Sequence, residues 1–357
     1  MNIRPEILAV PAYNFSEQSY KIKLDQNESP YDLPAKLKTE VLAKFAKLSF
    51  NRYPQLDAHS LREKLAKNIG WSSNNIVISG GSNILIQALV SAAAINKTVL
   101  TTRPSFSLYA MQAQIQAAKL VEISLKEGFE LPMTDLLAEL KKSSGVFFIA
   151  NPAAPTGNLF SKQDILALAQ ASSENWLMVI DEAYHEFSDS DYSYLINDFE
   201  HIVSLRTLSK AYGLAGVRLG YGLMDKKLAK EIQKLIIPFS ISIFQEIVAE
   251  VVLDNSKYLE ARIYDMKQEH KRVFAALEKM PNISPYQSTT NFILFKVNDA
   301  ASFYNNLLAQ GVLIRRQDHL MNLENCLRVN IGTKEENDIF LAAMEQTIKE
   351  LANGKTS

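Results

Sequence analysis

The sequence predicts an α/β fold, with a mostly parallel sheet in a large domain followed by a smaller α+β domain. Two observations support this fold class. Several short segments are apolar at nearly every position, which is typical of strands that are covered by helices on both faces. Helical patterns alternate with these segments along the chain, as the crossover connections of a parallel sheet require.

The expected elements of the large domain follow an extended arm at residues 1–35. The apolar spacing from Pro34 to Phe50 predicts a helix. The apolar segment at Asn75–Gly81 ends in glycines and precedes a buried helix, so it is expected to be a strand. Further strands are expected at 98–104, 145–157, 176–187, 201–210 and 217–224, and further helices after Phe160 and over 226–236.

The small domain begins with one long helical pattern, from Asn255 to Met280. Apolar positions and one histidine fall on one face at steps of three and four: Leu259, Ile263, Met266, His270, Val273 and Leu277. Beyond Pro281 the patterns alternate again and end in a last helix. We therefore expect an arm (1–35), a large domain (36–255) and a small domain (256–357) on which part of the arm packs, with a cleft between the domains.

The composition excludes several classes of function. The 38 basic and 39 acidic residues give a net charge of −1, unlike a nucleic-acid-binding protein. We find no membrane-spanning apolar run and no signal-peptide core, and the five histidines are too scattered to predict a metal site. Cys326 is the only cysteine, which fits a reducing compartment. We expect a cytoplasmic protein without membrane or nucleic-acid partners.

Polar residues follow two of the expected strands. Asp181 ends one strand, where burial raises the pKa of a carboxyl unless a partner is supplied. Lys210 ends another, and a lysine in a desolvated cleft can lose its proton and attack carbonyls. Taken singly, Asp181 is as readily a helix-capping or ion-paired residue, and Lys210 a surface lysine. Together they predict a site, because ligands bind outside the carboxyl ends of such strands.

The neighbours of Lys210 indicate that the ligand carries a phosphate. Thr207 and Ser209 supply hydroxyls, Arg218 supplies a planar cation, and SGGSN (79–83) opens a helix whose N-terminus favours anions. Phe106 could stack on a flat ring, although a core position is equally compatible with its spacing. An aldehyde cofactor with a phosphate and a ring nitrogen would use all of these groups, and that cofactor is pyridoxal phosphate.

The ordered motifs NPAAPTG (151–157), DEAY (181–184) and SLRTLSKAYGLAGVRLGYG (204–222) resemble those of the class I/II aminotransferases, which have the aspartate aminotransferase fold (fold type I). Within this family the chain is most similar to the histidinol-phosphate aminotransferases. Six further segments carry that similarity: LDQNESPYDLP (24–34), NRYPQ (51–55), SGGSN (79–83), RPSFSLY (103–109), LIRRQ (313–317) and CLRVNIGT (326–333). The implied reaction converts histidinol phosphate and 2-oxoglutarate to imidazole-acetol phosphate and glutamate in histidine biosynthesis.

The resemblance implies a role for each candidate residue. Lys210 would bond to the cofactor aldehyde and later move a proton, Asp181 would keep the ring nitrogen protonated, and Tyr184 would hydrogen-bond the ring oxygen. Phe106 would cover the ring. The phosphate would be held by Thr207, Ser209, Arg218 and the backbone at Ser82 and Asn83. Tyr53 would reach the cofactor of a second subunit in a homodimer, and the substrate would contact Arg328, Arg315, Tyr13 and Asn27.

Three departures from the family pattern affect these expectations. Ala154 stands where NPNNPTG has an asparagine, so the ring oxygen is left to Tyr184 alone or to Asn151. Asp32 replaces a glycine beside the substrate, and GSNI replaces an acidic turn. An aromatic amino-acid aminotransferase, which shares the motif set and would place a carboxylate on Arg328, stays open as an alternative. A threonine-phosphate decarboxylase, which has the same scaffold and cofactor, also stays open. A non-catalytic binding protein would not need Lys210, Asp181 and Arg218 together.

Overall fold

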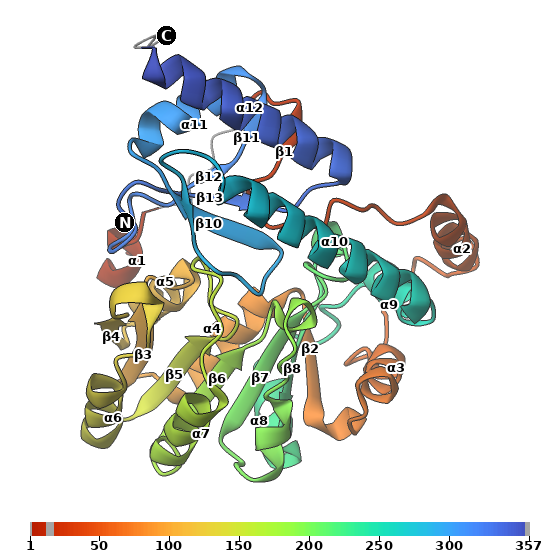
Figure 1. The fold of residues 1–357 in the computed structure, drawn as a ribbon. Coiled ribbons are helices and arrows are strands. Elements are labelled where there is room, and N and C mark those ends of the chain that lie inside the picture. The colour runs from red at the N-terminus through yellow and green to blue at the C-terminus, as the bar shows by residue number, and fades with distance from the viewer. Residues whose placement is uncertain (1, 12–17, 354–357) are drawn as a thin grey trace.

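The structure, a computed structural model, describes residues 2–11 and 18–353. It confirms the α/β class: a seven-stranded sheet has the order β2-β8-β7-β6-β5-β3-β4 (Figure 1). Every neighbouring pair is parallel except those of β8, which runs antiparallel to both β2 and β7. The strands are β2 (Ile76–Ser79), β3 (Thr98–Arg103), β4 (Lys119–Ser124), β5 (Gly145–Ala150), β6 (Trp176–Asp181), β7 (Ile202–Thr207) and β8 (Gly220–Met224).

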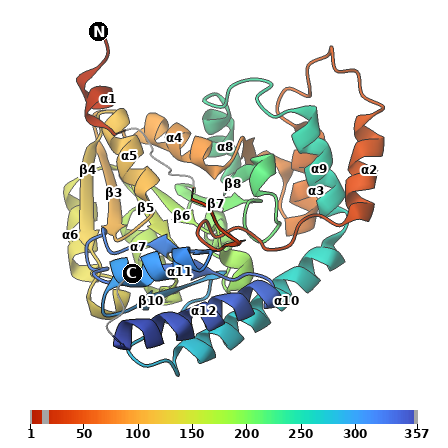
Figure 2. The same ribbon diagram turned by 90° about the horizontal axis from the view of Figure 1, so that it is seen from above.

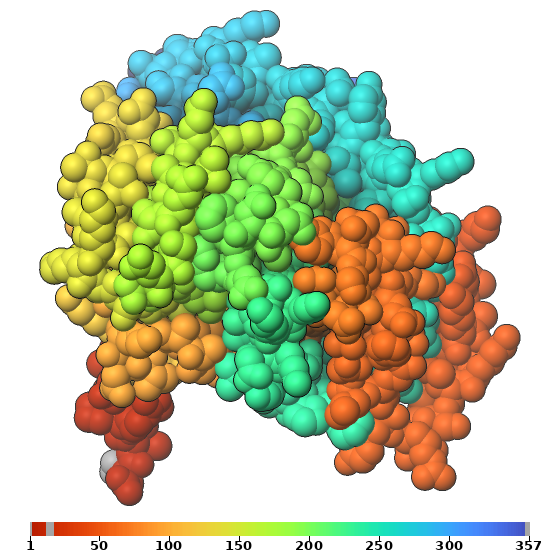
Figure 3. All heavy atoms as spheres, turned by 90° about the horizontal axis from the view of Figure 1, so that it is seen from below, coloured from red at the N-terminus to blue at the C-terminus, as the bar shows by residue number. Residues whose placement is uncertain are grey.

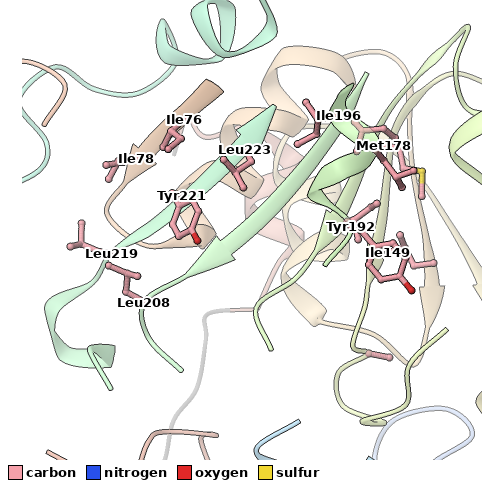
Figure 4. Close-up of a cluster of buried hydrophobic side chains, with 14 of the residues drawn as sticks. Ile76, Ile78, Ile149, Met178, Tyr192, Ile196, Leu208, Leu219, Tyr221 and Leu223 are labelled. Carbon is pink, nitrogen blue, oxygen red and sulfur yellow. The ribbon is translucent and has the colours of Figure 1, made fainter. Parts of the chain in front are cut away.

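Helices cover both faces of this sheet because its strands are apolar on both sides. On β5, Val146 and Phe148 pack on one face while Phe147 and Ile149 pack on the other, and all four are fully buried. The first face carries α4 (Ser82–Ala93), α5 (Ser107–Ile115) and α8 (Lys226–Gln233). The second carries α3 (His59–Ile69), α6 (Met133–Lys142) and α7 (Lys162–Ala171) (Figure 2). Figure 4 shows side chains of this second face, among them Ile149, Met178 and Leu223.

The arm differs in part from the extended segment that the sequence predicted. Residues Pro5–Ala9 form a short helix, α1, and the Arg4 guanidinium donates to the Ile115 carbonyl of α5 at 2.8 Å. In Figure 3 the N-terminal segment stands out from the body of the molecule. Farther along, α2 (Ala35–Phe45) and α9 (Ile243–Leu253) pack together. Helix α9 starts sharply because Ser242 and Gln245 form a capping box.

The C-terminal part has its own hydrophobic core. Its sheet has the order β12-β13-β10-β9 and packs with α10 (Ser256–Leu277), α11 (Ala300–Ala309) and α12 (Lys334–Ala352). The strands are β9 (Ser284–Pro285), β10 (Phe292–Lys296), β12 (Arg315–Arg316) and β13 (Cys326–Asn330). From the arm, β1 (Ile22–Lys23) pairs with β11 (Val312–Leu313), and Ile22 and Leu24 join this core. The predicted boundaries at 35/36 and 255/256 stay predictions.

Short 3-10 helices lie in the connections at Ser73–Asn75, Glu127–Phe129, His185–Phe187, Ser193–Asn197 and Ala215–Val217. In the described ranges, no helix combines the length and the apolarity that crossing a bilayer requires.

Candidate active site

The carboxyl edge of the large sheet brings Asp181 and Lys210 into one region. Asp181 is the last residue of β6, and Lys210 follows the neighbouring strand β7 by three residues. The backbone N–H of Asn151, which follows β5, donates to the Asp181 carbonyl at 2.9 Å. Three neighbouring parallel strands therefore deliver predicted site residues to the same edge, where such folds bind their ligands.

The Lys210 side chain is partly buried and lies among more positive than negative charges. Its Nζ donates to the Gln26 carbonyl at 2.9 Å and lies 6.0 Å from the centre of the Tyr184 ring. Burial lowers the pKa of Lys210 to about 7, and the nearby Arg328 and Arg218 lower it further, while Glu28 acts in the opposite direction. A large fraction of this amine is therefore uncharged at neutral pH and can act as a nucleophile.

The Asp181 carboxylate is buried and accepts one hydrogen bond at each oxygen. The Tyr109 hydroxyl donates to Oδ2 at 2.6 Å, and the Ala183 backbone N–H donates to Oδ1 at 3.1 Å. Burial raises the pKa of Asp181 to about 6, although both hydrogen bonds favour the charged form. Because a carboxylate oxygen can accept more than one hydrogen bond, Asp181 can still accept one from a protonated ring nitrogen.

Tyr184 and Asn27 join the large sheet to the arm. The Asn27 side-chain amide donates to the Tyr184 hydroxyl oxygen at 2.8 Å, and both residues are buried. Asn27 has a positive φ of 54° and its backbone N–H donates to the side-chain oxygen of Asn330 at 3.2 Å. Burial raises the pKa of Tyr184, so its hydroxyl keeps a proton that it can donate to an anionic oxygen.

The groups predicted to hold a phosphate lie close together, and two glycines allow this close approach. Arg218 Nη1 donates to the Ser209 hydroxyl at 3.4 Å, and Ser82 begins α4. A Cβ at Gly81 would lie 2.8 Å from Arg218 Nη2, and one at Gly220 would lie 2.2 Å from the Ser82 backbone nitrogen. A guanidinium, a hydroxyl and a helix N-terminus around such a cradle fit a phosphate.

Two further phosphate candidates lie beside this cradle. The Thr207 hydroxyl accepts from the Ser209 N–H at 3.1 Å and donates to the Leu219 carbonyl at 3.3 Å, which fixes the backbone before Lys210. Asn83 is the second residue of α4 and is exposed. Their contacts with a phosphate stay predictions.

Phe106 is 40% exposed, so it is not the core residue that its spacing alone allowed. Its ring meets the ring of Tyr109 edge to face, with centroids 5.6 Å apart. Sequence reasoning did not single out Tyr109, although it lies in the quoted RPSFSLY segment, three residues after Phe106. That spacing places both residues on one side of the start of α5.

Asn151 is fully buried and organises its own turn. Its side-chain oxygen accepts from the Phe160 backbone N–H at 2.9 Å. Whether Tyr184 alone or also Asn151 takes over the contact of the asparagine missing at Ala154 stays a prediction for both residues.

Arg328 and Arg315 lie directly opposite each other in the small sheet, paired across β13 and β12. Leu327, Val329 and Ile314, which alternate with them, are buried in the small-domain core, so both arginines lie on the other face. Arg328 Nη2 donates to the Asp25 carbonyl at 2.9 Å, and its guanidinium lies 5.2 Å from the Phe292 ring centre. Two positive charges directly opposite each other are destabilising, so a bound anion that contacts both guanidinium groups would relieve their repulsion.

The other predicted site residues lie apart from this centre or cannot be placed. Tyr53 is 84% exposed and packs on Phe239, with ring centroids 5.1 Å apart. Tyr13 lies outside the described residues. Within residues 2–11 and 18–353, no group of three or more His, Cys, Asp or Glu side chains could hold a metal ion.

The lowered pKa of the Lys210 amine, the buried Asp181 carboxylate and the groups around Arg218 lie together on this sheet edge and fit a pyridoxal-phosphate enzyme of fold type I. The family model for aminotransferase class I and II matches residues 19–344, and the chain belongs to that family. It is 40% identical over 344 residues to a histidinol-phosphate aminotransferase of Deinococcus radiodurans, covering 96% of this chain and 95% of that protein.

Solved structures have the same fold. The histidinol-phosphate aminotransferase of Sinorhizobium meliloti, in complex with pyridoxal 5′-phosphate, has a TM-score of 0.89 at 24% identity and covers 98% of each chain. The L-threonine-O-3-phosphate decarboxylase of Porphyromonas gingivalis has a TM-score of 0.79 at 20% identity, covering 92% of this chain and 99% of that one. Because the decarboxylase shares the fold, the fold alone does not choose between the two reactions.

Proposed function

We propose that this aminotransferase transfers the amino group of histidinol phosphate to 2-oxoglutarate. The observation that carries the choice of substrate is the cross-strand pair of Arg315 and Arg328. A phosphate monoester carries a charge of about −1.5 to −2 at neutral pH and can offset two cations. The single carboxylate of an aromatic amino acid offsets only one, so the pair favours a substrate that ends in a phosphate.

The position of Arg328 supports a substrate that reaches from the small domain to Lys210. Arg328 is among the charged groups that lower the pKa of Lys210. It is also held by the backbone of Asp25, one residue before the carbonyl that accepts from Lys210 Nζ. A substrate with its phosphate on the arginines would therefore extend its amino group toward the lysine.

The residues of this chain fit pyridoxal phosphate, and each of them has a different role toward it. The bound cofactor supplies an aldehyde carbon and an electron-accepting ring. Lys210 Nζ, with its pKa near 7, takes the proton from the substrate Cα and later returns it. With the cofactor bound, the Asp181 carboxylate would hold a proton at the ring nitrogen, and the Tyr184 hydroxyl would donate to the ring oxygen. Ser82, Ser209 and Arg218 would bind the phosphate.

A homodimer is part of the proposal. An apolar patch on the large domain consists of Phe50, Tyr53, Leu56, Ile237 and Phe239, all of them exposed. The Phe239 backbone N–H donates to the Leu56 carbonyl at 3.3 Å, so the two halves of the patch are one surface. Exposed apolar patches mark interaction sites, and a second copy of this chain would bring Tyr53 to the neighbouring phosphate. We also infer a cytoplasmic location, which the free, buried Cys326 supports.

The test is a titration of the cofactor-loaded protein with single amino donors, followed by loss of the visible band. Histidinol phosphate should react at far lower concentration than phenylalanine, tyrosine or glutamate. A preference for the aromatic amino acids would keep the aminotransferase and discard the histidinol phosphate assignment. Release of carbon dioxide from threonine phosphate, without formation of an oxo acid, would replace the proposal with the decarboxylase.

A further inference from the structure

Tyr109 joins three parts of the site, although no motif assigned it a role. Its side chain is fully buried, and its hydroxyl donates to Asp181 Oδ2 at 2.6 Å. Its ring stacks on Phe148 of β5, with centroids 4.6 Å apart and planes 5° apart. The ring also meets Phe106 edge to face. A tyrosine held by two rings has little freedom to move its hydroxyl.

The two hydrogen bonds to Asp181 set the orientation of its carboxylate. Tyr109 binds Oδ2 and the Ala183 N–H binds Oδ1, so neither oxygen can rotate away without losing a donor. The carboxylate is buried, and water cannot easily replace a lost donor there. The direction in which Asp181 presents its remaining lone pairs therefore depends on Tyr109.

We propose that Tyr109 is a positioning residue, whose hydroxyl aims the Asp181 carboxylate at the ring nitrogen of the cofactor and keeps it charged, while its ring supports Phe106. This inference rests on the proposed function, because it requires pyridoxal phosphate at Asp181. It adds to that function a residue that controls where the ring proton sits.

The charged groups around Asp181 explain why this donor matters. Burial raises the pKa of Asp181, and the neighbouring Glu182 raises it further. The Tyr109 hydroxyl, the Ala183 N–H and the positive charge of Lys210 act in the opposite direction. Burial and the Asp181 charge hold the pKa of Tyr109 well above its usual value, so Tyr109 stays a donor. Without it, Asp181 would keep the proton that the ring nitrogen needs.

The experiment titrates the visible band of the cofactor-loaded protein with pH and compares Tyr109→Phe with the wild type. A ring nitrogen without its proton withdraws fewer electrons from the Lys210–cofactor bond, so the nitrogen of that bond keeps its proton to higher pH. In Tyr109→Phe we expect the midpoint of the pH titration of the visible band to rise by about one pH unit. This is the usual effect of one hydrogen bond to a charged group. Equilibrium dialysis should show roughly tenfold weaker binding of pyridoxal phosphate.

Two controls separate positioning from a loss of packing. Tyr192→Phe removes another buried hydroxyl, which donates to the Phe160 carbonyl at 3.2 Å, and should leave the midpoint unchanged. In an Asp181→Asn background, Tyr109→Phe should add no further shift, because the residue acts through Asp181.

A Tyr109→Phe variant whose midpoint equals that of the wild type, or equals a shifted midpoint of Tyr192→Phe, would overturn the inference and leave the proposed function intact. An equal shift in the Asp181→Asn background would also overturn it. A wild-type protein that shows no visible band with saturating pyridoxal phosphate would overturn both.

Discussion

Two combinations of a cation and a carboxylate lie near the ends of β6 and β7. One forms a direct ion pair, and the other does not. Glu182 and Arg206 are both fully buried and form an ion pair at 2.9 Å, to which Ser204 and Asp191 add further contacts. Asp181 and Lys210 are instead each held by a neutral partner, Tyr109 and the Gln26 carbonyl. An acidic and a basic side chain thus form an ion pair in one case, whereas in the other case each has a different, uncharged partner.

The separation of Asp181 from Lys210 makes that couple reactive. Pairing with Glu182 raises the pKa of Arg206, so its charge is permanent. Burial without such pairing moves the pKa of Asp181 to about 6 and that of Lys210 to about 7. Groups that titrate near neutral pH can exchange protons, whereas a paired guanidinium cannot. The comparison indicates that function at this edge depends on which charges the fold leaves unmatched.

The largest expected effect comes from removing the reactive cation. Lys210→Ala should abolish the visible band of the loaded protein and lower turnover by at least about 10³-fold, because no other group at this position can move the proton. Absorbance spectra and the donor titration measure both effects. Circular dichroism should confirm that the variant folds, and retained turnover would remove Lys210 from the mechanism.

Breaking the paired couple should affect stability rather than chemistry directly. Arg206→Met leaves the Glu182 charge buried without its partner and should lower the free energy of unfolding by ~3–5 kcal/mol. Urea denaturation measures this change. The matched control is Lys227→Met, which removes an exposed ion pair with Glu200 and should have no measurable effect. An equal loss in the free energy of unfolding for both variants would mean that burial does not make the Arg206 pair more important than the exposed one.

The Asp181 couple predicts a pH-dependent stability in the cofactor-free protein. Because the folded-state pKa is raised to about 6, the protonated form stabilises the fold below pH 4, and this contribution is lost as pH rises through 6. Relative to the wild type, Asp181→Asn should therefore gain up to ~3 kcal/mol between pH 4 and pH 7. Urea midpoints at both pH values measure the gain, and a constant difference would contradict the raised pKa.

The smallest effect should come from the arginine pair of the small domain. Arg315→Gln should raise the KM for histidinol phosphate about tenfold and leave the KM for phenylalanine nearly unchanged, because only the phosphate needs two cations. Steady-state kinetics measure both values. Arg316→Gln is the matched control, since Arg316 is paired with Asp318 at 2.6 Å and alternates to the other side of β12. The same increase in KM for both variants would mean that the loss of any positive charge on β12 causes the effect, and not the loss of the pair with Arg328.

Residues that end apolar strands could be predicted from the sequence, because burial pattern and strand polarity place them together. Asp181 ends β6, and Tyr184 and Lys210 each follow the end of a strand by three residues. Tyr109 was missed because its functional atom lies at the tip of a buried ring on a helix, where spacing indicates only core packing. The opposition of Arg315 and Arg328 depends on an antiparallel register that no spacing reveals.

The fold was predicted best where elements are uniformly buried. Strand β4 was missed because its residues are half-buried or exposed at the sheet edge, so it has no apolar run. Helix α1 has only 5 residues, too few for a clear period, and its segment was expected to be extended. Helices α3, α5, α6 and α9 were not predicted either, and of these α5 carries Tyr109 of the candidate site.

The segment from Asp25 to Asn27 gives the N-terminal arm an unexpected importance for engineering. Three consecutive residues hold the guanidinium of Arg328, the amine of Lys210 and the hydroxyl of Tyr184. Deleting residues 1–27 would therefore remove all three contacts from the candidate active site while leaving the buried strands of the large sheet in place. The same deletion would also take Ile22 and Leu24 out of the small-domain core, so the arm links the order of the site to the packing of the small domain.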